Sequence, residues 1–317
     1  VKTKAGRKPA INSEKMDKVF HGNSISMKKN SRNELLSAAQ ADNLKKLNDY
    51  YIVNTENNPD IVEKLEQDTN IVEIFPNHLF TIDQYINDPR YDEQWSLRSI
   101  NVKKAWKLAT GKGILIGVID TGIDYDHEDL ENQLWINSEE DINGNGTFEP
   151  WSSDQEQNDV TGDLNGIDED GNGYPDDVIG YDFVDQYVTN VGDASNPDAD
   201  PADEQGHGTK VSGIIAAENN NKTGITGIAY DSKIVSMRAF DFNGTGESDD
   251  IARAIVYAAL NGVKVMNFSF GEPYDSPLIR DAVRFAFSMG CTMLASTGNN
   301  GWDRKHYPSD YREIIAV

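Results

Sequence analysis

From residue 101 onward, short apolar stretches alternate along the chain with amphipathic stretches of about a dozen residues. The apolar stretches predict strands, and the periodic stretches between them predict helices. Because alternating strands and helices form βαβ units, the pattern predicts an α/β domain with a parallel sheet covered by helices on both faces. The expected strands span residues 113–119, 234–239, 263–268, 292–295 and 313–317, and the expected helices span 102–108, 208–217, 249–261 and 276–289.

Residues 1–86 show a separate and smaller pattern, which predicts a small α+β domain before the larger domain at 87–317. Pro59 stands near the first turn of a predicted helix, on which Ile61, Val62 and Leu65 are expected to face inward. The polar stretch 83–95 forms the junction between the two domains. The other expected elements here are a helix at 33–47 and strands at 1–4, 50–53, 71–75 and 79–82.

The negative charge of the chain is distributed unevenly. Residues 1–86 hold 12 basic and 12 acidic residues, so the net charge of −24 comes entirely from the 17 basic and 41 acidic residues of 87–317. No Lys or Arg occurs between Lys112 and Lys210. Such a block repels itself unless cations neutralise it, which favours bound Ca²⁺ and argues against a nucleic-acid partner.

Two classes of feature are absent from the sequence. No run of 18 apolar residues occurs, so no transmembrane segment is expected. Cys291 is the single cysteine, which excludes a disulfide within the chain and predicts a buried thiol.

Three motifs follow one another in an order that suggests nucleophilic catalysis. Asp120 ends an apolar strand, His207 begins a helix between two glycines, and Asn299 follows another apolar strand. A histidine can act as general base near neutral pH, and a carboxylate can hold its tautomer. A side-chain amide can donate to a developing oxyanion, a role for which the spacing alone leaves both Asn299 and Asn300 open.

These motifs, together with residues 242–246 and 267–271, resemble the subtilase (subtilisin-like) family from about residue 94 to residue 317. The resemblance implies a subtilisin-like fold and a serine endopeptidase that works through an acyl-enzyme, with Asp120, His207 and Asn299 as catalytic groups. The family's nucleophilic serine lies in a Gly-Thr-Ser-Met-Ala stretch that these 317 residues do not contain. We therefore expect the serine to come from a C-terminal continuation or from a second chain.

The resemblance also implies how protein or peptide substrates bind. An extended substrate is expected to pair as an added β-strand between two edge segments whose glycines leave the backbone accessible. Ser269 matches the wall of the pocket and not the nucleophile, and Phe270 is expected to shape an apolar subsite. The candidate substrate-binding residues are Gly244, Thr245, Gly246, Ser269, Phe270 and Gly271.

Two loops in an acidic insertion at about 137–205 fit the first half of an EF-hand calcium loop, Asp-x-Asx-x-Asx-Gly. The alternating oxygen ligands converge on the ion, and the glycine permits a sharp turn. The glutamate expected at the twelfth position is replaced by Ser152 and Ile179. A solvated acidic insertion without metal is the alternative. The candidate ligands are Asp141, Asn143 and Asn145 in the first loop and Asp168, Asp170, Asn172, Asp176 and Asp177 in the second.

A further calcium site is implied by the resemblance alone. Family members hold a structural calcium with a glutamine near the mature start, an aspartate after the catalytic one and an asparagine-rich loop after the histidine helix. Gln94, Asp129 and Asn220 occupy these places.

The first domain resembles a subtilase propeptide, which implies an intramolecular chaperone and inhibitor of a secreted or cell-surface zymogen. Residues 79–86 would then lie in the cleft, and cleavage would fall between about Asp83 and Asn87. The alternatives are a permanently attached N-terminal domain, a purely calcium-binding adhesion module, and a catalytically inactive scaffold that binds peptides. The joint presence of Asp120, His207 and Asn299 favours the enzyme over the scaffold.

Overall fold

The computed structural model describes two compact units, Val1–Gln84 and Tyr85–Val317. The division falls two residues before the boundary expected from the sequence. Three predicted features lie outside the described residues: the helix at 33–47, the strand at 79–82 and residues 83–85 of the junction. The described residues are 2–4, 16–18, 49–53, 60–76, 86–150, 162–185, 192–193, 196–301 and 303–317.

The described part of the first unit consists of two strand pairs and one helix. Strand β1 (Lys2–Thr3) pairs antiparallel with β4 (Ile71–Glu73), and β2 (Met16–Lys18) pairs antiparallel with β3 (Tyr51–Val53). Helix α2 (Ile61–Glu66) is short and lies where a helix was predicted, while Pro59 is outside the described residues.

A small apolar cluster holds these elements together. Ile61 and Leu65 of α2 are buried, and partly buried side chains of β3, β4 and Ile74 pack against them. Val62 was expected to face inward, and this expectation is wrong because its side chain is 39% exposed. A helix of fewer than two turns can bury only one edge. Ile61 and Leu65, which are four residues apart, occupy that edge.

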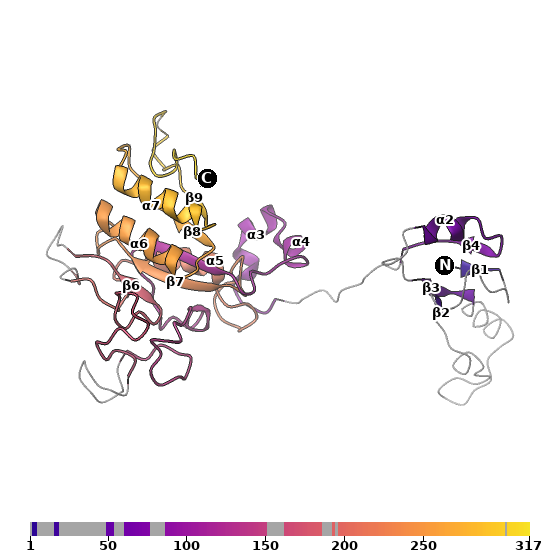
Figure 1. Cartoon of the computed structure of the whole chain (residues 1–317), viewed down its shortest axis with the longest axis horizontal. Coiled ribbons are helices and arrows are strands. Elements are labelled where there is room, and N and C mark those ends of the chain that lie inside the picture. Colours follow the sequence, from indigo (N-terminus) through magenta and orange to yellow (C-terminus); the bar gives the residue numbers. More distant parts are fainter. Residues whose placement is uncertain are drawn as a thin grey trace. The chain divides into compact units, whose positions relative to one another are not determined.

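The second unit is built on a six-stranded sheet with the strand order β10-β9-β8-β5-β7-β6. Every neighbouring pair in this sheet is parallel, which confirms the predicted α/β class. Figure 1 shows α6 and α7 side by side over this sheet. The strands are β5 (Leu115–Asp120), β6 (Gly180–Asp182), β7 (Lys233–Arg238), β8 (Val265–Phe268), β9 (Thr292–Ala295) and β10 (Ile314–Ala316).

Two apolar cores lie on the opposite faces of the sheet. Ile119 belongs to the larger core with the buried residues of α6 (Ser248–Leu260) and α7 (Pro277–Ser288). Ile116 and Val118 of the same strand belong to the other core, with Ala216 of α5 (His207–Ala216). Because successive strand residues point to opposite faces, this alternation shows that helices cover the sheet on both sides.

Local sequence signals explain where the helices begin. The Ser276 side chain accepts a hydrogen bond from the backbone of Ile279, and Pro277 takes the first helical position of α7. Two aspartates in the first turn of α6 match the positive end of its helix dipole. The remaining helices of this unit are α3 (Trp95–Ser99), α4 (Val102–Trp106) and the 3-10 turns Tyr91–Glu93 and Glu131–Gln133.

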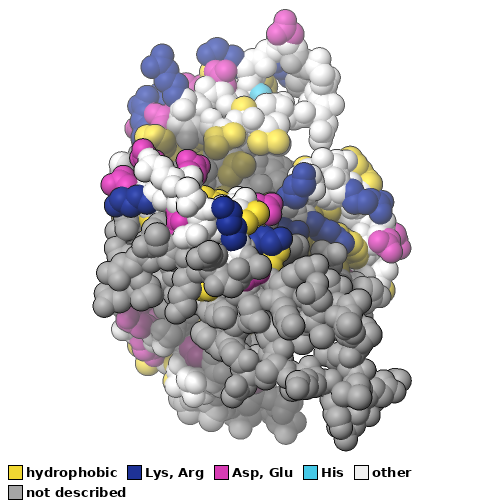
Figure 2. Space-filling view, turned by 90° about the vertical axis from the view of Figure 1, so that its right-hand side faces the viewer, with side chains coloured by type: hydrophobic (Ala, Val, Ile, Leu, Met, Phe, Trp, Pro, Cys, Tyr) yellow, Lys and Arg dark blue, Asp and Glu magenta, His cyan; other side chains and the backbone are white. Residues whose placement is uncertain are grey.

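The acidic insertion contributes one strand, β6, and otherwise consists of turns and bends within its described residues. β6 pairs with β7 at the edge of the sheet and was not predicted, although apolar residues flank it on both sides at Val178, Ile179, Phe183 and Val184. On the face of the molecule in Figure 2, Lys and Arg side chains lie among the acidic ones, whereas the insertion has no basic residue of its own. None of the helices in the described residues is long and apolar enough to cross a membrane.

Candidate active site

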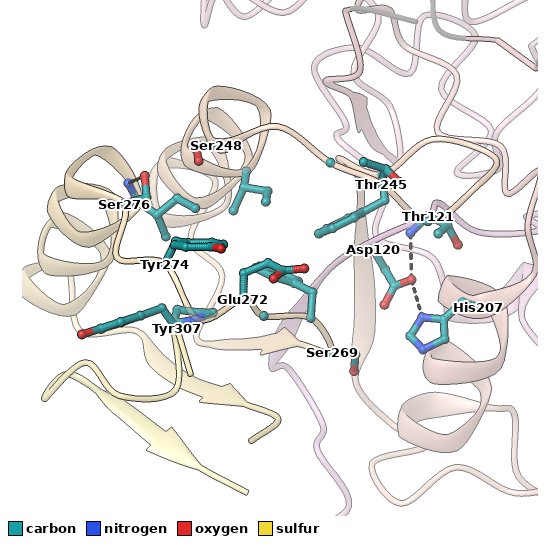
Figure 3. A pocket seen from close by; sticks show the side chains of 18 of the residues that line it. Asp120, Thr121, His207, Thr245, Ser248, Ser269, Glu272, Tyr274, Ser276 and Tyr307 are labelled. Carbon is teal, nitrogen blue, oxygen red and sulfur yellow. Dashed lines mark hydrogen bonds and ion pairs between the residues drawn. The ribbon is translucent and has the colours of Figure 1, made fainter. Parts of the chain in front are cut away.

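The centre of the site is a contact between two elements that are 87 residues apart in the sequence. Asp120 is the last residue of β5 and is 4% exposed, and His207 is the first residue of α5. The distance from His207 Nδ1 to Asp120 Oδ1 is 2.7 Å (Figure 3). Since a carboxylate can only accept, His207 donates from Nδ1, which leaves Nε2 as the acceptor in the neutral ring.

Burial and hydrogen bonding act in opposite directions on Asp120. Burial raises the pKa of Asp120, while the hydrogen bonds from His207 and from the backbone of Thr121 lower it. The histidine ring itself is half-exposed, with 48% of its side chain accessible. The pair therefore consists of a buried, anchored carboxylate and a base that faces the solvent.

The close approach of α5 to β5 depends on Gly208. A Cβ at this position would lie 2.1 Å from the backbone oxygen of Gly122, far inside van der Waals contact. Gly206, on the other side of His207, has a φ of 91° and turns the chain into the helix. The two glycines thus explain why the sequence flanks the histidine as it does.

A pocket of about 810 Å³ opens beside this pair (Figure 3). Its lining includes Asp120 and His207 together with both segments that were expected to bind substrate, 244–246 and 269–271. The first segment follows β7 and the second follows β8, so both come from the carboxyl ends of strands. Asn267 donates a hydrogen bond to the Ser269 hydroxyl at 2.8 Å, and no hydrogen bond between Ser269 and His207 is recorded among the described residues.

Apolar side chains line part of the pocket. The rings of Phe240 and Phe270 lie 4.9 Å apart between their centroids, and Ile251 and Ile279 also line the pocket. Two carboxylates, Glu272 and Asp275, line it as well. The sequence predicted a subsite at Phe270 but gave no signal for the other side chains, since they come from separate elements.

Asn299 lies in the turn after β9 and is exposed, as is Asn300. Neither side chain lines the pocket or makes a hydrogen bond that the structure records. Their placement leaves the choice between them open.

The His306 ring packs so tightly on Gly271 that a Cβ on Gly271 would lie 2.1 Å from the His306 Cε1 atom. Sequence analysis assigned no chemistry to His306, because its loop has no pattern that could reveal this packing.

The acidic insertion gathers its carboxylates into two overlapping clusters. Glu140, Asp170 and Asp177 form one, and Glu140, Glu169 and Asp176 form the other, with ligand atoms within 4.8 Å of one another in each cluster. Glu140 is fully buried and was missed in the sequence because it precedes the motif. Burial raises the pKa of Glu140 to about 7 and that of Asp177 to about 6.

The two predicted loops are related to these clusters in different ways. In the second loop, Asp170 belongs to a cluster, while Asp168 accepts hydrogen bonds from the backbone of Asn172 and Gly173. In the first loop, Asp141 accepts from the backbone of Gly144 and Gly146, and Asn143 donates to Asp163. Burial raises the pKa of Asp163 to about 6. The side-chain oxygen of the exposed Asn145 accepts from the backbone and the hydroxyl of Thr147, and the Asn145 backbone N–H donates to the Asn143 side-chain oxygen.

The donor set of the insertion fits a hard divalent cation. It consists of carboxylate and amide oxygens, several of them buried, in a stretch without any Lys or Arg. The acidic clusters could therefore hold a metal ion.

A separate set of oxygens surrounds the loop at 219–224. Asp88 is 4% exposed, and its Oδ1 atom has no hydrogen-bond partner among the described residues. The backbone N–H of Asn220 donates to the other oxygen of Asp88 at 3.1 Å, and the Asn221 side chain donates to Asp129 at 2.8 Å. A buried carboxylate oxygen without a donor is the kind of group that a cation stabilises.

Gln94 bonds to the loop through both ends of its side chain. Its amide nitrogen donates to the backbone oxygen of Thr226 at 2.9 Å, and its amide oxygen accepts from the Thr226 backbone N–H at 3.0 Å. The amide oxygen keeps a second lone pair, so the role of Gln94 as a calcium ligand stays a prediction. Asp88, which the sequence did not single out, has a carboxylate oxygen without a hydrogen-bond partner among the described residues.

The sequence that carries this site matches a known protein family. The profile of the subtilase family, Peptidase_S8, matches residues 111–317. The chain belongs to the subtilase family, as its motifs predicted. The recognised region contains the whole parallel sheet together with Asp120, His207 and Asn299.

Individual relatives agree with this assignment. The "Thermophilic serine proteinase" of Bacillus sp. (strain AK1) is 32% identical over 286 residues, which cover 90% of this chain and 58% of that protein. The "Minor extracellular protease Epr" of Bacillus subtilis (strain 168) is 30% identical over 267 residues, covering 81% of this chain and 32% of that protein. The chain thus spans between a third and three-fifths of the length of these two relatives.

Among solved structures, one described as proteases from Pseudoalteromonas arctica PAMC 21717 superposes with a TM-score of 0.55. It covers 73% of this chain and 64% of the other at 24% identity. This likeness supports the fold.

Proposed function

We propose that the chain belongs to a secreted, calcium-binding serine endopeptidase in precursor form, and that it carries the cleft and the Asp–His pair of that enzyme. The observation that carries the proposal is the 2.7 Å contact between His207 and Asp120, beside a pocket lined by both predicted substrate segments. Family membership gives the reaction class, and the geometry gives roles to these residues.

In the proposed mechanism, His207 Nε2 takes the proton from a serine hydroxyl as its oxygen attacks the carbonyl carbon of the scissile peptide. Asp120 accepts the Nδ1–H bond and stabilises the imidazolium that forms. The imidazolium then gives its proton to the leaving amine, which leaves an acyl-enzyme. A water molecule attacks the acyl carbon with His207 again as the base, and the serine is released.

Two further groups complete this proposal. The Gly-Thr-Ser-Met-Ala stretch that would carry the serine is not among these 317 residues, and Ser269 is not proposed for the role, because no hydrogen bond from it to His207 is recorded among the described residues. Asn299 donates its side-chain amide to the oxyanion in the tetrahedral intermediate. Its exposed position after β9 leaves the amide free to do so.

Substrates are proteins or peptides that enter the pocket in an extended conformation. The backbone of 244–246 lines one part of the pocket and that of 269–271 lines another, which suits pairing with an added strand. The apolar side chains around Phe270 would take an apolar substrate residue.

Calcium is the proposed cofactor, with a structural role. Glu140, Asp170, Asp176 and Asp177 would hold it in the insertion, and Asp88 and Asp129 would hold it beside the 219–224 loop. When bound, calcium neutralises carboxylates that otherwise repel one another. The first unit is proposed to be the inhibitory propeptide, and the extracellular relative supports secretion.

The competing candidate is an inactive scaffold that binds peptides in the same pocket. The two are separated by removing the first unit from the full-length protein, incubating the product with an internally quenched peptide and measuring both binding and cleavage. We expect cleavage in the parent and its loss in Asp120→Asn, because Asn cannot stabilise the imidazolium. Binding without cleavage in the parent would establish the scaffold.

A further inference from the structure

Asp203 lies four residues before His207 and has an unusually complete set of hydrogen-bond donors. Its Oδ1 atom accepts from the backbone of Gln205 at 3.0 Å and of Gly206 at 2.7 Å. Its Oδ2 atom accepts from the backbone and the hydroxyl of Thr209 at 2.9 and 2.6 Å. The carboxylate therefore fixes the backbone immediately before and after His207, at the positive end of α5.

A fifth donor links Asp203 to the strand that carries Asp120. The Thr121 hydroxyl donates to Asp203 Oδ1 at 2.8 Å and accepts from the backbone N–H of Gly208 at 2.9 Å. The direction of the first bond is fixed, because an ionised carboxylate can only accept and the hydroxyl has one proton. The backbone N–H of Thr121 donates to Asp120 Oδ1 at 2.8 Å, on the same oxygen that His207 contacts.

The loop that contains Asp203 is itself anchored. Glu204, the next residue, accepts a hydrogen bond from Arg238 Nη2 at 3.0 Å, and Arg238 is 1% exposed at the end of β7. Arg238 is the sheet partner of Asp120 across the β5–β7 ladder. Hydrogen bonds thus anchor the loop before α5 at both Asp203 and Glu204.

We propose that Asp203 is a positioning residue, which sets the orientation of His207 toward Asp120 by joining Thr121 to the first turn of α5. The proposal rests on the proposed role of the Asp120–His207 pair in proton transfer. The bridge acts beside two further contacts of the same region, since the backbone N–H of Asp124 donates to the Thr209 hydroxyl at 2.9 Å and Gly208 packs closely on the backbone of Gly122.

The test is the hydrogen exchange of the His207 Nδ1–H in the full-length protein, followed by NMR. Thr121→Val removes the bridging hydroxyl but keeps the bonds from Asp203 to the start of α5, and we expect at least about tenfold faster Nδ1–H exchange. Thr121→Ser keeps the hydroxyl and should restore the parent rate. Asp203→Asn, which loses one acceptor oxygen of the bridge, should also speed the exchange.

Thr110→Val is the matched control, because Thr110 also donates to an aspartate, Asp231, at 2.5 Å, but far from α5 along the chain. It should leave the exchange at the parent rate. Unchanged exchange in a folded Thr121→Val variant or in a folded Asp203→Asn variant would overturn the proposal. The readout does not require peptide cleavage, so the proposal can fail or stand independently of the protease assignment.

Discussion

The sheet and the acidic insertion place their functional groups in different ways. Asp120 is the last residue of a central strand, and the ladders on both sides of β5 fix its position. The carboxylates around Glu140 are held mainly by turns and by hydrogen bonds to backbone N–H groups. The first arrangement is fixed by backbone hydrogen bonds of the sheet, whereas the second concentrates negative charge that a bound cation would balance.

The largest effect should follow from His207→Ala. Removing the general base is expected to lower kcat/KM for peptide cleavage by about 10⁴-fold or more. The melting temperature should change little, because the side chain is half-exposed and its loss leaves no large cavity. Lys210→Ala on the same helix is the control and should retain activity. Equal activity in the parent and in His207→Ala would show that His207 is not the general base and that the edge of the sheet is not the catalytic region.

Calcium removal should act on the other region. Chelation is expected to lower the melting temperature by about 5–10 °C, because an ion bound only to the folded state stabilises it by mass action. Hydrogen exchange should increase at residues 137–182 more than in β5 and β7. An equal increase in hydrogen exchange in the insertion and in the sheet would show that calcium does not stabilise the insertion more than the sheet.

The pH dependence of stability without calcium gives a finer test. The pKa of Glu140 is raised from 4.5 to about 7 in the folded chain by burial, so the folded state binds its proton more tightly than the unfolded state. The free energy of unfolding should therefore fall as pH rises from about 4.5 to about 7. Glu140→Gln should reduce this slope, as followed by thermal melts at several pH values, and should weaken the response to added calcium. A slope of opposite sign in the parent would contradict the burial argument.

The smallest effects are expected beside the 219–224 loop. Asp88→Asn should remove part of the stabilisation by calcium, about 2–4 °C in melting temperature, and should have little effect in chelator. Gln94→Ala should lower the melting temperature equally with and without calcium, because the Gln94 side chain bonds to Thr226. If Gln94→Ala proved sensitive to calcium and Asp88→Asn did not, Gln94 would be the ligand, as the family resemblance first implied.

The sheet was predictable because its signals are local. An apolar run that ends in Asp120 specifies both the strand and the place of the carboxylate, and the six-residue β5 ends at that residue. Glycines on both sides of His207 indicated the close approach that Gly208 makes to Gly122. The pairing of the two residues was implied by the resemblance to the subtilase family, and not by these local signals.

The insertion was less predictable because its order comes from contacts between distant turns. Glu140 joins Asp170 and Asp176 through backbone hydrogen bonds across 30 and 36 residues, which no local motif reveals. The three-residue strand β6 is defined by its pairing with β7 and not by its composition. Asp203 could have been noticed as a carboxylate before a helix start, but its bond to Thr121 required the fold.

The most direct test of the central claim is labelling of the full-length protein with a fluorophosphonate, which reacts with a serine only when that serine is activated. The account predicts covalent labelling of one serine in the parent and labelling at background in His207→Ala, with peptide mapping to identify the serine. No labelling of a folded parent with calcium bound and the first unit removed, or equal labelling of both proteins, would contradict the claim that Asp120 and His207 activate a nucleophile.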